Sequence, residues 1–212
     1  TFEQIEDGQY KEVAMDRAQA LKISMIETKE NVCANVYNRA FNSSYTGGDG
    51  VCLLSTAHPT LSGNQSNKLA TAADFSQASL EDMIIQIMDA KNDRGLKIKL
   101  MPETLHVHRN QLFEAERVLN SQLQSDTANN AINAVKSLRV IPGGVKVNSY
   151  FTDADAWFIR TNAVKGLTHF QRKAMEFTKD GDFHTMNALA KCVERYSVGY
   201  GDWRTLFGSE GS

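Results

Sequence analysis

Residues 13–42 contain neither glycine nor proline, and this feature limits the possible folds most strongly. Apolar side chains recur there three or four positions apart, the spacing of one helix face. We therefore predict a single helix over residues 13–42, about 40 Å long at 1.5 Å per residue. Because an average helix has only about 11–12 residues, something must lie against one this long. The apolar positions are Ala14, Ala18, Leu21, Met25, Val32, Val36 and Ala40.

The composition permits a folded core but gives no sign of strong nucleic-acid binding. With 212 residues, 42% of them hydrophobic, the chain can bury a core as one domain or two small ones. The net charge of −2 argues against tight binding of nucleic acid and does not oppose self-association. No apolar run approaches the roughly 20 residues of a membrane span. Three cysteines without a CxxC motif indicate unpaired thiols in a reducing compartment.

The middle of the chain mixes helix and strand signals. We predict a helix within residues 74–95, capped by Ser76 or Ser79, and another over residues 110–124. Residues 56–75 and 125–137 are rich in small polar side chains and are predicted as a loop and a polar excursion. Strands are expected at residues 51–55, 96–102, 104–108, 138–142, 145–151 and 156–161.

The last part of the chain predicts a long two-stranded ribbon. Residues 167–178 have strand character, residues 179–182 contain the Asp-Gly pair of a hairpin turn, and residues 183–201 return as the second strand. Residues 202–208 then close the chain. A two-stranded ribbon is only marginally stable alone. We therefore expect it to pack on the long helix and on a neighbouring subunit.

Ser55 and His58 are the first candidates for catalysis. A nucleophile and a base can meet from three residues apart, but a triad also needs an orienting acid and an oxyanion hole. No GxSxG elbow surrounds Ser55. The residue before a proline prefers extended geometry, so we favour a structural role in which His58-Pro59 ends a strand.

Other residues with chemical potential favour structural roles as well. His106 and His108 would share one side of a strand, but no third metal ligand is apparent, and His58, His169 and His184 are scattered. The glycines of YTGGDG and IPGGV match turns better than a phosphate loop. Paired carboxylates can do acid–base chemistry or bind calcium. The sequence around them favours solvated turn positions instead, for Asp153, Asp155, Asp180 and Asp182. We therefore expect no catalytic residue, no cofactor-binding residue and no metal site.

Four basic residues on the predicted ribbon leave three possibilities open. They could contact DNA, pair with acidic residues of a neighbouring chain, or form a solvated strand face. The sequence does not separate these alternatives. The residues are Arg172, Lys173, Lys191 and Arg195.

The order of motifs resembles the major capsid protein of tailed phages, in the branch of the Mu-like major head subunit. The resemblance is carried by the long helix and by stretches that together span most of residues 13–207. These stretches are LLSTAHPTLSGNQSNKL, LMPETLHVHRNQLFEAERVLNS, SYFTDADAWFIRT and GLTHFQRKAMEFTKDGDFHTMNALAKCVERYSVGYGDWR. No single stretch is specific, but their order and spacing together carry weight.

The resemblance implies an α+β chain with the Hong Kong 97-type capsid fold. Residues 1–12 would be the end of an extended loop. A peripheral domain would comprise residues 13–70 and 165–196, with 13–42 as its spine helix and a long β-hairpin as its sheet. A mixed α/β axial domain would comprise residues 71–164 and 197–212. The STAHP stretch would then be a turn that leads from the peripheral to the axial domain.

The implied function is structural. The chain would self-assemble into pentamers and hexamers of an icosahedral viral head that encloses double-stranded DNA, which it would contact weakly and without sequence preference. Portal, scaffold and decoration proteins are expected as further partners, with no membrane. The expected location is the virion, assembled in the bacterial host cytoplasm. The alternatives are an encapsulin-type compartment shell protein and a soluble hydrolase that uses Ser55 and His58.

Overall fold

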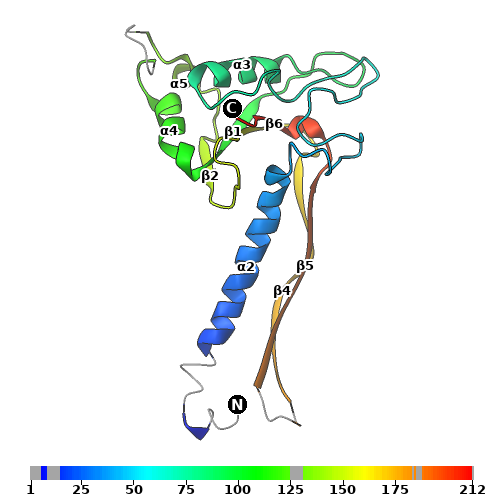
Figure 1. Cartoon of the computed structure of the whole chain (residues 1–212), viewed down its shortest axis with the longest axis vertical. Coiled ribbons are helices and arrows are strands. Elements are labelled where there is room, and N and C mark those ends of the chain that lie inside the picture. The colour runs from blue at the N-terminus through cyan, green and yellow to red at the C-terminus, as the bar shows by residue number, and fades with distance from the viewer. Residues whose placement is uncertain (1–5, 9–14, 125–130, 183, 185–187, 212) are drawn as a thin grey trace. The chain divides into compact units, whose positions relative to one another are not determined.

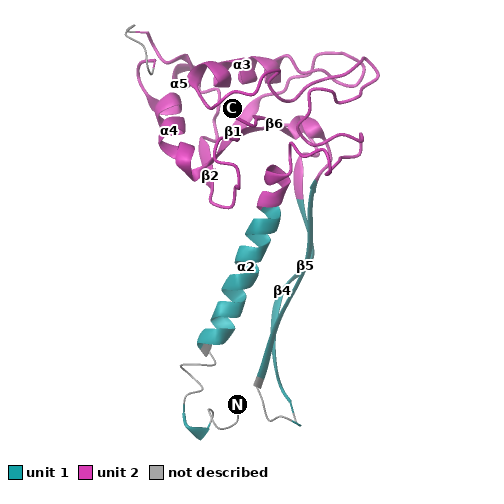
Figure 2. Cartoon of the chain, in the orientation of Figure 1, with its two compact units in different colours: residues 1–33, 169–199 teal, residues 34–168, 200–212 magenta. Residues whose placement is uncertain are grey.

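The computed structural model describes residues 6–8, 15–124, 131–182, 184 and 188–211, and it is an α+β structure of two compact units. Unit 1 comprises residues 1–33 and 169–199, and unit 2 comprises residues 34–168 and 200–212 (Figure 2). None of the described helices combines the length and apolar character that a membrane crossing requires.

The predicted long helix is confirmed as α2, Met15–Asn38 (Figure 1). Residues 13 and 14 lie outside the described residues, and the helix ends at Asn38 instead of residue 42. Beyond Asn38 the backbone N–H groups of Ala40 and Asn42 bond three residues back, to the carbonyls of Tyr37 and Arg39, instead of four. The carbonyl of the buried Ala40 accepts from the N–H of Leu54 at 2.8 Å, which ties this end of the helix to the following loop.

The predicted ribbon is confirmed as a two-stranded sheet of β4, Leu167–Gly181, and β5, Ala188–Tyr200. The turn predicted at residues 179–182 is misplaced, because β4 continues to Gly181. Strand pairing overrides the local turn preference of Asp180 and Gly181 here. Residues 183 and 185–187, part of the predicted second strand, lie outside the described residues.

Unit 2 contains a four-stranded sheet in the order β2-β1-β3-β6. Strand β1 pairs parallel with β2 and antiparallel with β3, which pairs antiparallel with β6. Strands were predicted at residues 104–108, 145–151 and 156–161, and all three are confirmed with adjusted ends. The strands are β1, Pro102–His108; β2, Val145–Asn148; β3, Trp157–Thr161; and β6, Leu206–Ser209.

The predicted strands at residues 51–55, 96–102 and 138–142 are wrong. Each of the first two forms only an isolated bridge, between Thr46 and Cys52 and between Lys91 and Lys97. The second segment also ends at Pro102, which is the first residue of β1. The third begins at the end of a helix and continues into a turn. All three carry apolar residues because they bury side chains, not because they pair as strands. The buried residues are Leu53, Leu54, Leu100 and Ile141.

The helices of unit 2 are α3, Gln77–Met88, α4, Leu112–Asn120, and α5, Ala134–Leu138. The first two were predicted, although α3 ends before Gly95, and a short 3₁₀ turn, Arg109–Gln111, precedes α4. Ser76 caps α3 in a capping box with Ser79. Helix α5 was missed, because residues 125–137 were predicted as a polar excursion. Of these, residues 125–130 lie outside the described residues.

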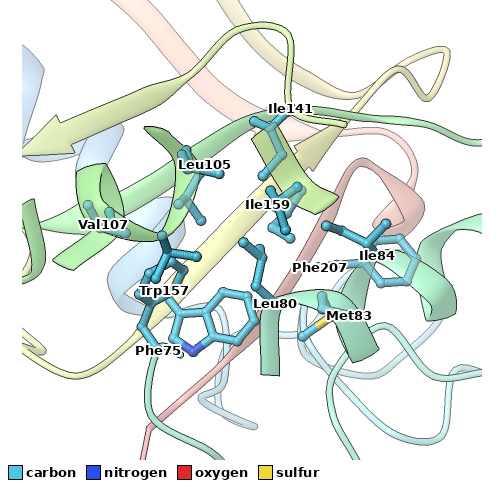
Figure 3. Close-up of a cluster of buried hydrophobic side chains, with 14 of the residues drawn as sticks. Phe75, Leu80, Met83, Ile84, Leu105, Val107, Ile141, Trp157, Ile159 and Phe207 are labelled. Atoms are coloured by element: carbon cyan, nitrogen blue, oxygen red, sulfur yellow. The ribbon is translucent and has the colours of Figure 1, made fainter. Parts of the chain in front are cut away.

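Both faces of the four-stranded sheet carry buried side chains. Leu105, Ile159 and Phe207 are register partners across β1, β3 and β6 and point into one cluster with Leu80 and Met83 of α3 (Figure 3). The alternate strand residues point to the other face. There, Phe158 and Leu206 belong to a second cluster, with Ala34, Ala40, Leu53, Leu54, Phe151 and Ala156. Unit 2 therefore has the hydrophobic core of an independent folding unit.

Two leucines of unit 2 provide a matched test of this core. Leu80 is 0% exposed within the first cluster, whereas Leu61 is 87% exposed. We expect Leu80→Ala to lower the free energy of unfolding by about 2–5 kcal/mol through lost burial and a residual cavity. Leu61→Ala should change it by less than about 0.5 kcal/mol. Urea unfolding followed by tryptophan fluorescence measures both, and equal effects would contradict the assigned core.

Candidate functional site

Ser55 and His58 do not form a nucleophile–base pair. His58 is buried, its Nε2 lies 3.0 Å from Oδ1 of Asn67, and its Nδ1 lies 2.5 Å from Oδ2 of Asp49. The Ser55 hydroxyl instead accepts from the backbone N–H of Ala57 at 3.2 Å. Both ring nitrogens of His58 are therefore engaged by residues other than Ser55.

Asn67 fixes the direction of these hydrogen bonds. Its Nδ2 donates to the carbonyls of Leu53, Trp203 and Leu206 at 2.7–3.2 Å, so its Oδ1 must be the acceptor. The Nε2–H of His58 consequently donates a hydrogen bond to Oδ1 of Asn67. A nitrogen that donates has no free lone pair with which to deprotonate a serine. Because the other ring nitrogen faces Asp49, neither nitrogen of His58 is placed to act as a base for Ser55, which argues against the hydrolase alternative.

The aromatic ring of Trp203 connects His58 to a cationic group. The imidazole and indole rings are stacked with centroids 4.2 Å apart, and the Arg204 guanidinium lies 4.2 Å from the indole centroid. Arg204 also donates to Asp93 at 2.7 Å, to Asp202 at 3.3 Å and to the carbonyl of Lys91. We call His58, Asp49, Asn67, Trp203 and Arg204 the polar node. It joins loops far apart in the sequence.

An open cleft of about 600 Å³ borders the polar node. Its charged walls include Asp49, Asp93, Asp202 and Arg204. These groups are already paired, Asp49 with His58 and the other two carboxylates with Arg204. The cleft therefore offers neither a poised nucleophile nor a free set of metal ligands among these four residues.

His106 and His108 are both used in the packing of unit 2. His106 lies 2.9 Å from the Thr104 hydroxyl and packs on the ring of Tyr37, with centroids 5.3 Å apart. Nδ1 of the buried His108 accepts from the backbone N–H of Asn110. Within the described part of the chain, no group of three histidine, cysteine or acidic residues could hold a metal ion. Of the other histidines, which the sequence suggests are scattered, His58 belongs to the polar node and His169 stacks on Tyr196 in unit 1.

The predicted turn residues act mainly through backbone contacts. Oδ1 of Asp153 accepts from the N–H of Asp155 at 3.0 Å, and Oδ1 of Asp182 accepts from the N–H of His184. Asp180, by contrast, lies within β4, where its Oδ1 accepts from Gly181. The YTGGDG and IPGGV glycines form turns, as predicted, with positive φ at Gly50 and Gly144.

Unit 1 differs from unit 2 because its described residues form no hydrophobic core. Among its described residues no hydrophobic residue is buried, and both buried clusters consist of unit 2 residues. Several of its large apolar side chains are exposed to solvent. They are Ile23, Ile26 and Val32 of α2, and Phe170, Phe177, Leu189 and Val193 of the ribbon. A sequence scan for catalytic motifs does not detect such a surface.

An ion pair links the helix and the ribbon inside unit 1. Nζ of Lys29 lies 2.8 Å from Oε1 of Glu194, whose side chain is fully withdrawn from solvent. Hydrogen bonding to Glu194 raises the pKa of Lys29. Gln171 donates to the same oxygen at 3.3 Å. This contact fixes which faces of α2 and of the ribbon point toward each other.

The four basic ribbon residues do not act as one group. Lys173 pairs with Glu176, whereas Arg172, Lys191 and Arg195 are exposed. Hydrogen bonding from Lys173, together with the charges of Lys173 and Lys191, lowers the pKa of Glu176. The exposed basic residues thus remain available to an external acidic partner.

Comparison with known proteins gives one informative match, to a protein family. A family model described as "Phage capsid protein" matches residues 1–208. A search of curated proteins found no match. Among solved structures, the chain is similar to one described as "Crystal structure of virus-like particle from Pyrococcus furiosus". They share 10% identity with a TM-score of 0.43 over 68% of this chain and 55% of the other, a likeness too weak to carry an argument.

Asn67 offers a test of the polar node. Asn67→Asp replaces the Nδ2 donor by an oxygen that faces three carbonyls, so we expect a loss of about 3 kcal/mol or more in unfolding free energy. Asn64→Asp makes the same chemical change at an exposed position and should be nearly neutral. Denaturant unfolding measures both variants. Equal stability of the two would show that the node contributes nothing.

His106 makes a pH-dependent contribution to stability. Burial, aided by the positive charges of Arg160 and Lys146, lowers its pKa from 6.5 to about 4. The unfolded chain therefore takes up a proton between pH 6.5 and about 4 that the folded state excludes. The stability from this site is complete above pH 6.5 and lost as the pH falls through that window.

We expect His106→Phe to reduce the fall in unfolding free energy across this window. The difference should approach about 3 kcal/mol, because each pKa unit corresponds to about 1.4 kcal/mol. Urea titrations of both proteins at pH 7, 5.5 and about 4 measure the difference. An identical pH dependence in the two proteins would rule out His106 as its source.

Proposed function

The chain belongs to the phage capsid protein family, and from this premise we propose that it is the major head subunit of a tailed phage. Many copies associate as pentamers and hexamers of an icosahedral shell around double-stranded DNA. The protein performs no chemical reaction in this role. Its function is mechanical, because weak contacts repeated through a symmetric assembly produce a stable closed shell.

The absence of a hydrophobic core among the described residues of unit 1 is the observation that carries this proposal. A two-stranded ribbon is marginal in water unless it packs on other elements. Here one helix packs on it, and large apolar side chains remain exposed on both. Neighbouring copies in a shell supply the missing burial.

We further propose the Hong Kong 97-type fold, with α2 as the spine helix. In this assignment the peripheral domain comprises residues 13–70 and 165–196, and the axial domain residues 71–164 and 197–212. Residues 1–12 end an extended loop. The support is the resemblance of the motif order, together with a long helix and a long ribbon in one α+β chain.

The remaining partners follow from the same proposal. Portal, scaffold and decoration proteins bind the shell, and the subunit is part of the virion after assembly in the host cytoplasm. A net charge of −2 supports only weak contact with packaged DNA, without sequence preference. In this proposal each of these partners is bound and none is chemically changed.

The oligomeric state of the full chain tests this proposal. We expect sedimentation velocity and negative-stain electron microscopy of the purified protein to show rings or closed particles of many copies. A monomer that persists as the protein concentration is raised would contradict it. The contents of the particles provide a second criterion. Nucleic acid inside favours the head protein, and protein cargo inside would favour an encapsulin-type compartment instead.

A further inference from the structure

The outward face of α2 is acidic and apolar. Half-buried residues recur on one side of the helix at Ala18, Leu21, Met25, Lys29 and Cys33. The Lys29–Glu194 ion pair shows that this side faces the ribbon. The opposite side is a stripe at spacings of three and four residues. This stripe, the helix patch, consists of the exposed residues Asp16, Ala20, Ile23, Glu27 and Glu30.

The charge of the helix patch has one sign. It contains three carboxylates and no lysine or arginine, and the side chain of Ile23 among them is 56% exposed. Arg17 and Lys22 lie to the two sides of the stripe, because each is displaced by about a quarter turn or more from its centre. The patch therefore offers an acidic surface with an apolar centre.

The outward face of the ribbon has the opposite sign. On β5 the half-buried Cys192, Glu194 and Tyr196 alternate with exposed Lys191, Val193 and Arg195. Because Glu194 faces α2, the alternate residues of the strand face away from it.

The contacts of β4 identify which of its residues share this outward face. Gln171 donates to Glu194, and His169 stacks on Tyr196, so both point toward α2. Phe170 and Arg172 therefore point outward, and Phe170 is 64% exposed. The ribbon patch thus consists of Phe170, Arg172, Lys191, Val193 and Arg195. The negative charge of Glu176, on the same strand, is balanced by its ion pair with Lys173.

We propose that the helix patch of one copy docks on the ribbon patch of the next copy. The inference rests on the proposed shell function and names the surfaces through which unit 1 contributes to it. Three carboxylates around Ile23 complement three basic groups around Phe170 and Val193 in both charge and apolar character. The occupant of the ribbon patch is therefore a second copy of this chain.

The helix and the ribbon of unit 1 lie side by side (Figure 2). Each patch is on the face turned away from the other element, so the two patches lie on opposite sides of unit 1. A contact between two different patches is heterologous, so each copy uses one patch for each neighbour. Such contacts close into a ring when the rotation between copies allows it. The same contact also covers three of the large apolar side chains that are exposed in unit 1, Ile23, Phe170 and Val193.

Charge reversal tests the proposal without removing apolar packing. The helix variant is Glu27→Lys with Glu30→Lys, and the ribbon variant is Lys191→Glu with Arg195→Glu. Each alone places like charges opposite each other and should raise the protein concentration needed for assembly about tenfold or more. The chain that carries both pairs of changes regains complementary patches and the wild-type net charge. It should assemble near the wild-type concentration.

Mixing provides the matched control. When combined, the helix and ribbon variants should co-assemble into rings of even copy number such as hexamers, because the two variants alternate and each supplies the partner patch that the other lacks. A ring of five cannot alternate and keeps one like-charge contact, so the readout is the recovery of hexamers. The far-ultraviolet circular dichroism and tryptophan fluorescence of each variant should match those of the wild type, which ensures that lost assembly is not lost folding. Higher ionic strength should weaken wild-type assembly, because exposed pairs are screened.

The outcomes separate this inference from the proposed function. Wild-type protein that forms no assembly overturns the proposed function itself. Wild-type assembly with unaffected single variants, or with no rescue by the combined or mixed variants, overturns only the patch-to-patch contact. A ribbon variant that assembles normally but retains less nucleic acid overturns it too, and assigns the ribbon patch to DNA.

Discussion

Hydrophobic side chains are buried within unit 2 but not among the described residues of unit 1, and the proposed shell function depends on that contrast. The four-stranded sheet of unit 2 is covered on both faces by buried clusters. The described part of unit 1 has a long helix and a long ribbon, joined by the Lys29–Glu194 pair, with apolar side chains left in solvent. Burial is the main favourable term in folding. In the proposed shell, neighbouring copies therefore supply the burial that the described residues of unit 1 lack.

Unit 2 is held together by polar contacts as well as by its core. Residues 42–75 contain no regular helix or strand, yet Asn67 binds backbone carbonyls at both ends of this unit's sequence. The stack of His58 on Trp203 and the bonds of Arg204 fix further loops. Buried polar groups that are fully paired specify one arrangement of the backbone. Unit 2 is therefore suited to transmit contacts as a rigid body.

The sequence alone predicted elements whose periodicity reflects their own burial. The helix at 13–42, the ribbon and the strand at 156–161 were found in this way. The strand predictions at 51–55 and 96–102 failed because these segments are loops without strand partners, whose apolar side chains are nevertheless buried. Asp49 and Asn67 were missed as partners of His58, because each lies nine positions away and only the fold brings them together. The signs of the two patches likewise require knowing which faces point outward.

Hydrogen exchange, measured on free subunits and on assembled particles, shows whether unit 1 depends on its neighbours. We expect amides of α2 up to Cys33 and of the ribbon to exchange rapidly in the free subunit and to become strongly protected on assembly. Amides of the four-stranded sheet should be protected in both states. If the ribbon is as strongly protected in the free subunit, unit 1 is stable without neighbours and its need for them is refuted.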